Sequence, residues 1–114
     1  IFPEQYELIS LYESEPVLID TSAPWTYNRL EFTRTIGENR IECIIEPSDA
    51  TLRIRWSQHG MLVIDLDLHK VHGLTVESVN GVDALIADFR EGSGVSPLRV
   101  QLKPSIHVFW GTYE

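Results

Sequence analysis

The sequence predicts a mainly β fold: an antiparallel meander of about eight strands with a barrel-like or sandwich core, preceded by a short N-terminal helix. From residue 28 onward, apolar and polar residues alternate in short runs, which is typical of half-buried strands. Turn-forming residues separate these runs, and only the first residues show helical spacing. We expect one domain over residues 1–114, with a helix and irregular lead-in over 1–27 and the meander over 28–114.

The length and composition favour a single folded, soluble domain. With 114 residues, 43% hydrophobic and 23% charged, the chain is ordinary for a globular protein and leaves no room for a second independent core. No apolar run approaches the roughly 20 residues that span a bilayer, and the start lacks a signal-peptide pattern. Because Cys43 is the only cysteine, no intrachain disulfide can form, and the cytoplasm is the expected location.

Residues 3–14 are expected to form the helix. Tyr6, Ile9 and Tyr12 recur at roughly helical spacing, and an early proline suits a first helical turn. The apolar run at residues 17–19 is too short to assign, because turn-forming residues flank it on both sides.

The alternating runs define the expected strands. An antiparallel pair must place the apolar residues of both strands on one face, so each hairpin register can be tested on the sequence. A one-residue slip would mix the two faces. The expected strands cover residues 29–35, 40–46, 51–57, 61–68, 74–79, 82–89, 98–102 and 105–110.

Two of the expected hairpins have clear turn signals. Residues 47–50 read Pro-Ser-Asp-Ala, a turn sequence. Asn80-Gly81 is the strongest hairpin signal in the chain, because both residues tolerate positive φ. The first turn places Ile45 opposite Leu52, Cys43 opposite Ile54, Ile41 opposite Trp56 and, on the outer face, Glu42 opposite Arg55. The second pairs Val76 with Leu85 and Leu74 with Ala87.

Two further hairpins are expected from loop length. A three-residue loop over 58–60, with Gly60 in a left-handed bulge position, pairs Trp56 with Leu62, Ile54 with Ile64 and Leu52 with Leu66, and brings Arg53 to Asp65. Loops after Arg90 and around residues 103–105 pair Phe89 with Leu98, Leu102 with Ile106 and Val100 with Val108. Cys43, Trp56 and Trp110 then have inward parity, so we expect them in the core, with Cys43 protonated.

The charge balance disfavours some partners and favours others. The chain has 9 basic and 17 acidic residues, a formal charge of -8. Such a field repels nucleic acids and anionic membranes and attracts a protein with a basic surface. No glycine-rich phosphate loop, metalloprotease motif or nucleophile elbow occurs in the sequence, so we name no catalytic residue.

Four acidic residues are candidates for contact with a cationic partner, and all are expected on the outer face of the sheet. They are Glu42, Asp65, Asp67 and Glu77. If residues 69–73 form a loop, Asp65 lies opposite Glu77, and directly opposed like charges invite a cation. That cation could be Arg53, a metal ion, or a lysine or arginine of another protein.

Two aromatic residues complete the candidate partner-binding set. Trp25 and Tyr27 lie in a proline-containing stretch outside any clear strand. Exposed aromatic side chains are favoured anchors at protein interfaces. The alternative is that both rings cap one end of the core.

The segment from Trp56 to Phe89 reads WSQHGMLVIDLDLHKVHGLTVESVNGVDALIADF and contains an L-x-L-x-x-V-x-x-L-x-V rhythm between Leu66 and Val76. It resembles the small β-rich immunity proteins of bacterial polymorphic-toxin systems. The resemblance implies a binding protein that occludes a toxin, and the acidic charge would suit a basic nuclease as the target. No functional residue is carried over from it.

The sequence therefore favours a non-enzymatic protein-interaction domain, in particular an immunity protein that binds and neutralises a basic toxin. We expect no cofactor and no bound metal, and the oligomeric state stays open. One alternative is a β-barrel that binds a small molecule among its inward residues. The other is a metal-dependent enzyme that uses Asp65, Asp67, His69 and His72.

Overall fold

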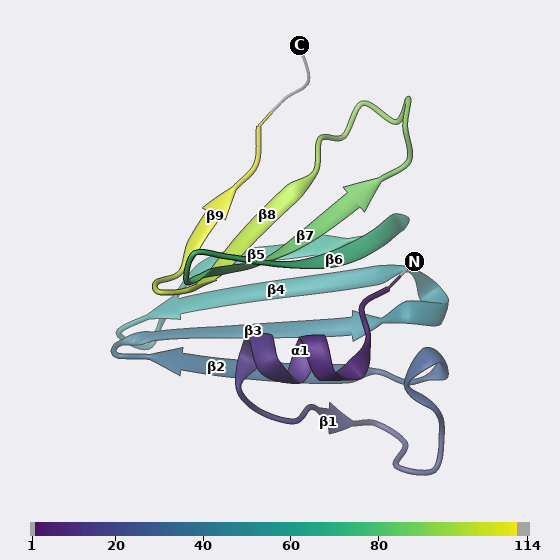
Figure 1. Ribbon diagram of the computed structural model, residues 1–114, viewed down its shortest axis with the longest axis horizontal. Coiled ribbons are helices and arrows are strands. Elements are labelled where there is room, and N and C mark those ends of the chain that lie inside the picture. Colours follow the sequence, from purple (N-terminus) through teal and green to yellow (C-terminus); the bar gives the residue numbers. More distant parts are fainter. Residues whose placement is uncertain (1, 112–114) are drawn as a thin grey trace. The chain divides into compact units, whose positions relative to one another are not determined.

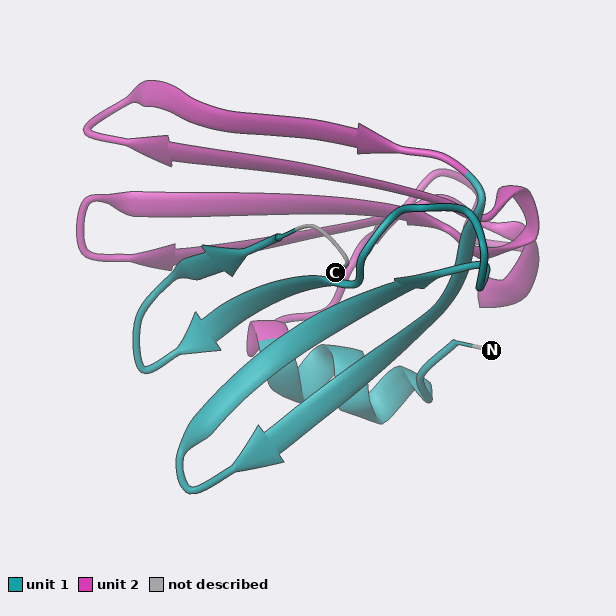
Figure 2. Ribbon diagram, turned by 90° about the horizontal axis from the view of Figure 1, so that it is seen from above, with its two compact units in different colours: residues 1–11, 70–114 teal, residues 12–69 magenta. Residues whose placement is uncertain are grey.

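The computed structural model describes residues 2–111 and contains two compact units (Figure 1). Unit 1 comprises Ile1–Leu11 and Lys70–Glu114, and unit 2 comprises Tyr12–His69 (Figure 2, teal and magenta). Each unit contains one antiparallel sheet. That both units fold as one domain stays a prediction. No helix within residues 2–111 has the length and apolar character needed to cross a membrane.

The mainly β fold and the short N-terminal helix are confirmed. In chain order the elements are α1 (Gln5–Tyr12), β1 (Val17–Leu18), the 3-10 turn η1 (Trp25–Tyr27), β2 (Leu30–Ile36), β3 (Asn39–Glu46), the 3-10 turn η2 (Pro47–Asp49), β4 (Thr51–Gln58), β5 (Met61–Leu68), β6 (Val71–Val79), β7 (Val82–Phe89), β8 (Leu98–Lys103) and β9 (His107–Phe109). The strands form two open sheets, of five and four strands, so no closed barrel forms within residues 2–111.

The sheet of unit 2 has the strand order β1-β2-β3-β4-β5. Its β3–β4 hairpin has the predicted register, because η2 and the left-handed Ala50 (φ 55°) turn the chain where the sequence indicated. One face of this sheet is buried, with relative exposures of 0–1%, by Leu30, Phe32, Ile41, Cys43, Ile45, Leu52 and Ile54. The other face carries the charged side chains.

The predicted β4–β5 register is wrong by two residues. Trp56 lies opposite Ile64, because His59 (φ 50°) and Gly60 (φ 76°) form a two-residue turn in place of the expected three-residue loop. The register then shifts between Trp56 and Ser57, which leaves Val63 as the extra residue of a β-bulge. Beyond the bulge, each β4 residue lies opposite a β5 residue two positions later than predicted. Because side chains alternate with a period of two, the predicted inward and outward residues of β5 keep their faces there.

The meander breaks between β5 and β6, so the predicted pairing of Asp65 with Glu77 is wrong. Asp65 belongs to the sheet of unit 2 and Glu77 to the sheet of unit 1. Only His69 and Lys70 join the two strands, and Lys70 adopts the left-handed conformation (φ 57°). The two-residue hairpin turns of this chain have positive φ at their first residue, whereas His69 is not among the positive-φ residues, so residues 69–70 do not form such a turn.

The sheet of unit 1 has the strand order β6-β7-β8-β9. The Asn80-Gly81 turn (φ 54° and 79°) and its predicted register are confirmed, as is the pairing of Val100 with Val108. Leu98 pairs with Ala87, however, and not with Phe89.

The β7–β8 ladder has a register shift between Asp83 and Ala84, and the loop before β8 is held by contacts outside that ladder. Pro97 has no N–H for a ladder, and the Oγ of Ser96 donates to the carbonyl of Gly111 while its carbonyl accepts from Nε1 of Trp110. Trp110 is 43% exposed and stacks on Phe89, so the prediction that it lies in the core is wrong. Trp56 is half-buried and donates through Nε1 to Oδ1 of Asn39.

Helix α1 lies beside the sheet of unit 1 (Figure 2). It is shorter than predicted, because Oε1 of Glu7 accepts from the backbone N–H of Glu4 at the start and Glu13 adopts a positive φ of 55° at the end. Leu8 is buried, and Nζ of Lys103 donates to the carbonyl of Ser10 at 3.1 Å.

Candidate protein-binding face

Three of the four predicted acidic residues share the outward face of the unit 2 sheet. Alternation along β3, β4 and β5 places their outward residues opposite the buried set. We call this surface the charged face, formed by Arg40, Glu42, Ile44 and Glu46 of β3, Thr51, Arg53 and Arg55 of β4, and Asp65 and Asp67 of β5. Glu77 lies on β6 of unit 1, where its Oε1 is 2.7 Å from Nη1 of Arg99.

Asp65 is held by two arginines of the neighbouring strand. Its two carboxylate oxygens accept from Nε and Nη2 of Arg53 at 3.1 and 2.9 Å, and Nε of Arg55 is 3.8 Å away. The Arg53 contact was predicted, but it forms diagonally, because Arg53 lies opposite Asp67 in the ladder. The hydrogen bond from Arg53 lowers the pKa of Asp65 below its ordinary value and raises the pKa of Arg53.

The other two carboxylates of the predicted set are held more loosely. Glu42 is 3.6 Å from Nε of Arg40, and Asp67 is 3.6 Å from Nε2 of His69. The Asp67 side chain is 60% exposed, twice the fraction of Asp65. Asp67 is therefore the more accessible carboxylate of β5 for an incoming cation.

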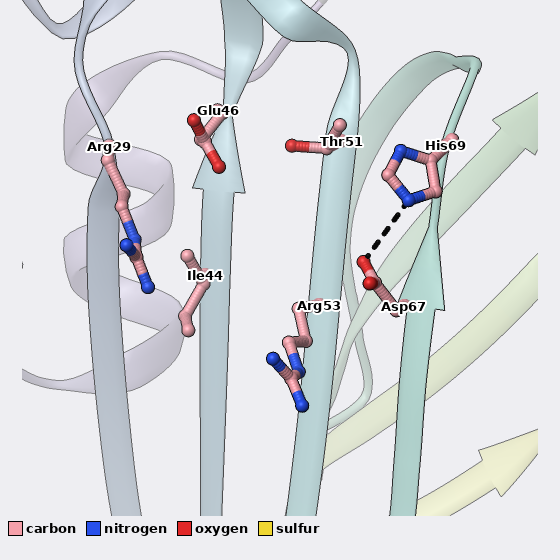
Figure 3. A pocket seen from close by; sticks show the side chains of 7 residues that line it. All are labelled: Arg29, Ile44, Glu46, Thr51, Arg53, Asp67 and His69. Atoms are coloured by element: carbon pink, nitrogen blue, oxygen red, sulfur yellow. Dashed lines mark ion pairs between the residues drawn. The ribbon is translucent and has the colours of Figure 1, made fainter.

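A hollow of about 230 Å³ opens at one end of the charged face (Figure 3). This is where β2 begins, β3 ends, β4 begins and β5 ends. The hollow is lined by Arg29, Ile44, Glu46, Thr51, Arg53, Asp67 and His69. In Figure 3 the Asp67 and His69 side chains point toward one another, with Thr51 on the adjacent strand β4 and Glu46 on β3 beyond it.

Two residues that line the hollow have polar groups without a partner among the described residues. Glu46 forms no ion pair with any residue of the described 2–111 range. Nε of Arg29 is buried and has no hydrogen-bond partner among the described atoms. Unsatisfied groups of this kind favour a polar or charged occupant, such as a protein side chain, over an apolar one. Sequence reasoning missed both residues, although Glu46 shares the outward parity of Glu42.

The two predicted aromatic anchors differ in exposure. Trp25 is half-buried and meets the edge of Phe32 at a centroid distance of 6.1 Å, whereas Tyr27 is 73% exposed. The buried Asn28 fixes this segment, since its Nδ2 donates to the carbonyls of Asp20 and Ala23. Its Oδ1 accepts from two backbone N–H groups. Tyr27 thus projects from a rigid loop of unit 2.

Cys43 is buried on the inward face, as predicted. Burial raises the pKa of its thiol to about 12. Burial also raises the pKa of Tyr12 well above its ordinary value, and the Tyr12 ring stacks on Phe32 at 4.7 Å. The thiol therefore stays protonated and acts as a small apolar side chain.

The metal-enzyme alternative finds no ligand set. Within residues 2–111 no group of three or more His, Cys, Asp or Glu side chains is placed to hold a metal ion. Asp65 is occupied by Arg53, and His72 lies on β6 of unit 1. The barrel alternative likewise lacks its architecture, because both sheets are open.

The fold matches a solved toxin–immunity structure. One chain of a contact-dependent growth inhibition toxin–immunity protein complex from Klebsiella pneumoniae 342 superposes with a TM-score of 0.84. The match covers 98% of this chain and 96% of that chain at 15% sequence identity. The predicted resemblance to the immunity-protein class is thus confirmed at the level of the fold. Comparisons with models of known protein families and with curated protein sequences find no match.

Proposed function

We propose that this chain is a non-enzymatic immunity protein that binds and neutralises a protein toxin with a basic surface. The observation that carries the proposal is the fold match to a chain of a toxin–immunity complex over almost the whole length of both chains. A cytoplasmic location is part of the proposal, since an immunity protein must meet its toxin inside the cell that it protects.

Electrostatics supports a basic partner. The formal charge of -8 produces a field that attracts cationic proteins and speeds their encounter. All five basic residues of unit 2 are arginines, and ten acidic residues outnumber them. The attraction is therefore long-range and comes from the whole chain, whereas the charged face itself alternates in sign.

That alternation assigns different roles to the carboxylates. Asp65 is already neutralised by Arg53 and Arg55, so it orders the face without offering a free charge. Asp67 and Glu46 flank the hollow on β5 and β3 and have no arginine within 4 Å. We propose that cationic side chains of the toxin pair with these two carboxylates at the hollow, and that an acceptor of the toxin meets the unpaired Nε–H of Arg29. Tyr27, on the same unit, is the proposed aromatic anchor.

Co-expression with a toxin encoded by a neighbouring gene tests the proposal. Cells that express the toxin domain alone should stop growing, and cells that also express this chain should grow. The purified proteins should form a complex whose association rate falls steeply as salt is raised. Growth arrest by this chain alone, or no complex at low salt, would contradict the proposal.

Asp67→Asn tests the placement of the site, with Glu91→Gln as its matched control. Each variant removes one negative charge, and Glu91 lies in an exposed loop of unit 1. A site at the hollow predicts that Asp67→Asn raises the Kd for the toxin about tenfold, while Glu91→Gln changes it less than about twofold. Equal effects of the two variants would show that only the net charge matters.

A further inference from the structure

The β5 strand is a long edge strand of the unit 2 sheet, paired on one side only. It runs from Met61 to Leu68 and pairs with β4 alone, and no other strand within residues 2–111 joins it. Every second residue of such an edge directs its N–H and C=O away from the sheet. Unpaired edges of this length are templates for another strand, and proteins usually shorten or cover them.

The β-bulge changes what this edge presents. Without it, the alternation of Leu68, Leu66 and Ile64 would give Leu62 the inward parity; with it, Leu62 lies opposite Ser57 and joins Asp65 and Asp67 on the outward face. The consequence is a run of three exposed apolar side chains, with exposures of 73%, 50% and 51% for Met61, Leu62 and Val63. An apolar run at an unpaired edge marks an interaction site or an aggregation hazard.

The other edge strands are less suited to accept an added strand. At the far edge of the same sheet, β1 has only two residues and follows Pro16. In unit 1, β6 is one residue longer than β5, but Val71 and Leu74 in its first half are each only 2% exposed. The edge strand β9 has three residues. Among the described strands, β5 is therefore the edge best suited to accept a new strand.

The charges of β5 indicate which strand it would accept. If two copies of this chain paired through β5 with a two-fold axis near Leu66, Asp65 of one copy would face Asp67 of the other, and directly opposed like charges are destabilising. A strand with cationic side chains at alternate positions meets no such penalty. It gains an attraction to Asp67, which has no arginine within 4 Å.

We propose that an extended segment of the toxin pairs with the free edge of β5 and extends the unit 2 sheet by one strand. The segment carries a lysine or arginine that faces Asp67, and an apolar residue that packs on Leu62. Backbone hydrogen bonds supply affinity, and the alternate side chains supply selectivity. This inference rests on the proposed function and specifies how the toxin is held.

Amide hydrogen exchange of the full chain, with and without the toxin domain, tests the pairing. The outward amides of β5 should exchange at least about tenfold more slowly in the complex, because each gains a backbone acceptor. A complex with unchanged β5 exchange would overturn the inference and leave the proposed function intact. No complex at all would contradict both. Slowing of β5 exchange by raised concentration of this chain alone would identify a second copy as the occupant and overturn the inference.

Leu62→Lys and Val79→Lys form a matched pair of variants. Both replaced residues are exposed apolar residues beside a two-residue turn, with exposures of 50% and 56%, and they lie on β5 and β6 respectively. Leu62→Lys should raise the Kd for the toxin at least about tenfold, whereas Val79→Lys should leave it within about twofold. Circular dichroism of both variants checks the fold. Equal affinities in two folded variants would contradict docking at β5.

Discussion

Unit 1 and unit 2 each contain an antiparallel sheet, but the two sheets differ in how far their carboxylates and edge strands are paired within the chain. In unit 1, α1 lies beside the sheet, Glu77 is paired with Arg99 at 2.7 Å, and Val71 and Leu74 of the edge strand β6 are buried. In unit 2, the eight-residue strand β5 pairs with β4 on one side, no strand of residues 2–111 pairs with its other side, and the side chain of Asp67 is 60% exposed.

This difference favours unit 2 over unit 1 as the unit that binds the toxin. An edge strand and an exposed carboxylate can exchange their bonds to water for bonds to a partner without breaking an internal ladder or arginine pair. Unit 2 therefore carries the proposed toxin-binding surface, and unit 1 carries exposed residues that serve as controls. The predictions below test whether the units are one folding domain and whether unit 2 is built as described.

The largest effect is expected from the core of unit 1. Leu85→Ala removes a side chain that is 1% exposed, and such a change costs about 2–5 kcal/mol of unfolding free energy. If residues 1–114 form one domain, the loss should appear equally in the alkylation of Cys43, which lies in unit 2. Unchanged protection of Cys43, while the amides of the unit 1 strands exchange faster, would show two separate domains.

The buried thiol of Cys43 gives unit 2 a dependence on alkaline pH. Its pKa is about 12 when folded and returns to its ordinary value near 9.0 when unfolded. The stabilising contribution is complete below pH 9 and is lost at about 1.4 kcal/mol per pH unit as the pH rises toward 12. Urea unfolding at pH 8, 9 and 10 measures this slope. The free energy of unfolding of Cys43→Ala should fall less steeply with pH than that of the parent chain. Equal slopes in the two proteins would refute the burial of a protonated thiol.

The tight turns of the two units should respond alike. Gly60 in unit 2 and Gly81 in unit 1 have φ of 76° and 79°, and no atom lies within 4 Å of an added Cβ at either position. Replacement by alanine should therefore cost only the backbone penalty, about 1 kcal/mol of unfolding free energy at each site. A much larger loss at one site than at the other in chemical denaturation would mean that the two turns are not equivalent.

The smallest effect is expected at the exposed ion pair of unit 2. Arg53→Gln removes the hydrogen bonds that lower the pKa of Asp65, so that pKa should rise toward its ordinary value. The stabilisation from the ionised carboxylate is present above the unfolded pKa and is lost as the pH falls through the lower, folded value. Carboxyl-carbon NMR titration reports the shift directly. Identical titration of Asp65 in both proteins would show that Arg53 does not hold it.

The registers show what local sequence can and cannot predict. The β3–β4 and β6–β7 pairings followed from residues 47–50 and Asn80-Gly81, because these sequences favour one turn geometry. The β4–β5 register failed because His59 as well as Gly60 adopts positive φ and makes a two-residue turn, whereas the expected three-residue loop has Gly60 alone in the left-handed position. The error still preserved inward and outward parity beyond the bulge, so most of the core and the Arg53–Asp65 contact were predicted correctly.

The candidate site was only partly predictable, because local alternation shows which residues share a face but not which strands are neighbours. Parity along a strand placed Glu42, Asp65 and Asp67 on one face, but it could not show that the chain leaves the sheet after His69 and takes Glu77 to another. The hollow depends on which strand ends coincide, because Arg29 and Glu46 meet Asp67 there only through the order of four strands. Strand order is a long-range property that alternation does not encode.

The most direct test of the central claim, that unit 2 holds the toxin, is an amide NMR titration of the isotope-labelled chain with the unlabelled toxin domain. Our account predicts that the largest shift changes fall on the charged face and on β5, with Asp67 and Leu62 among them, and that the strands β7 to β9 change little. Shift changes centred on unit 1, with β5 unaffected, would contradict the account.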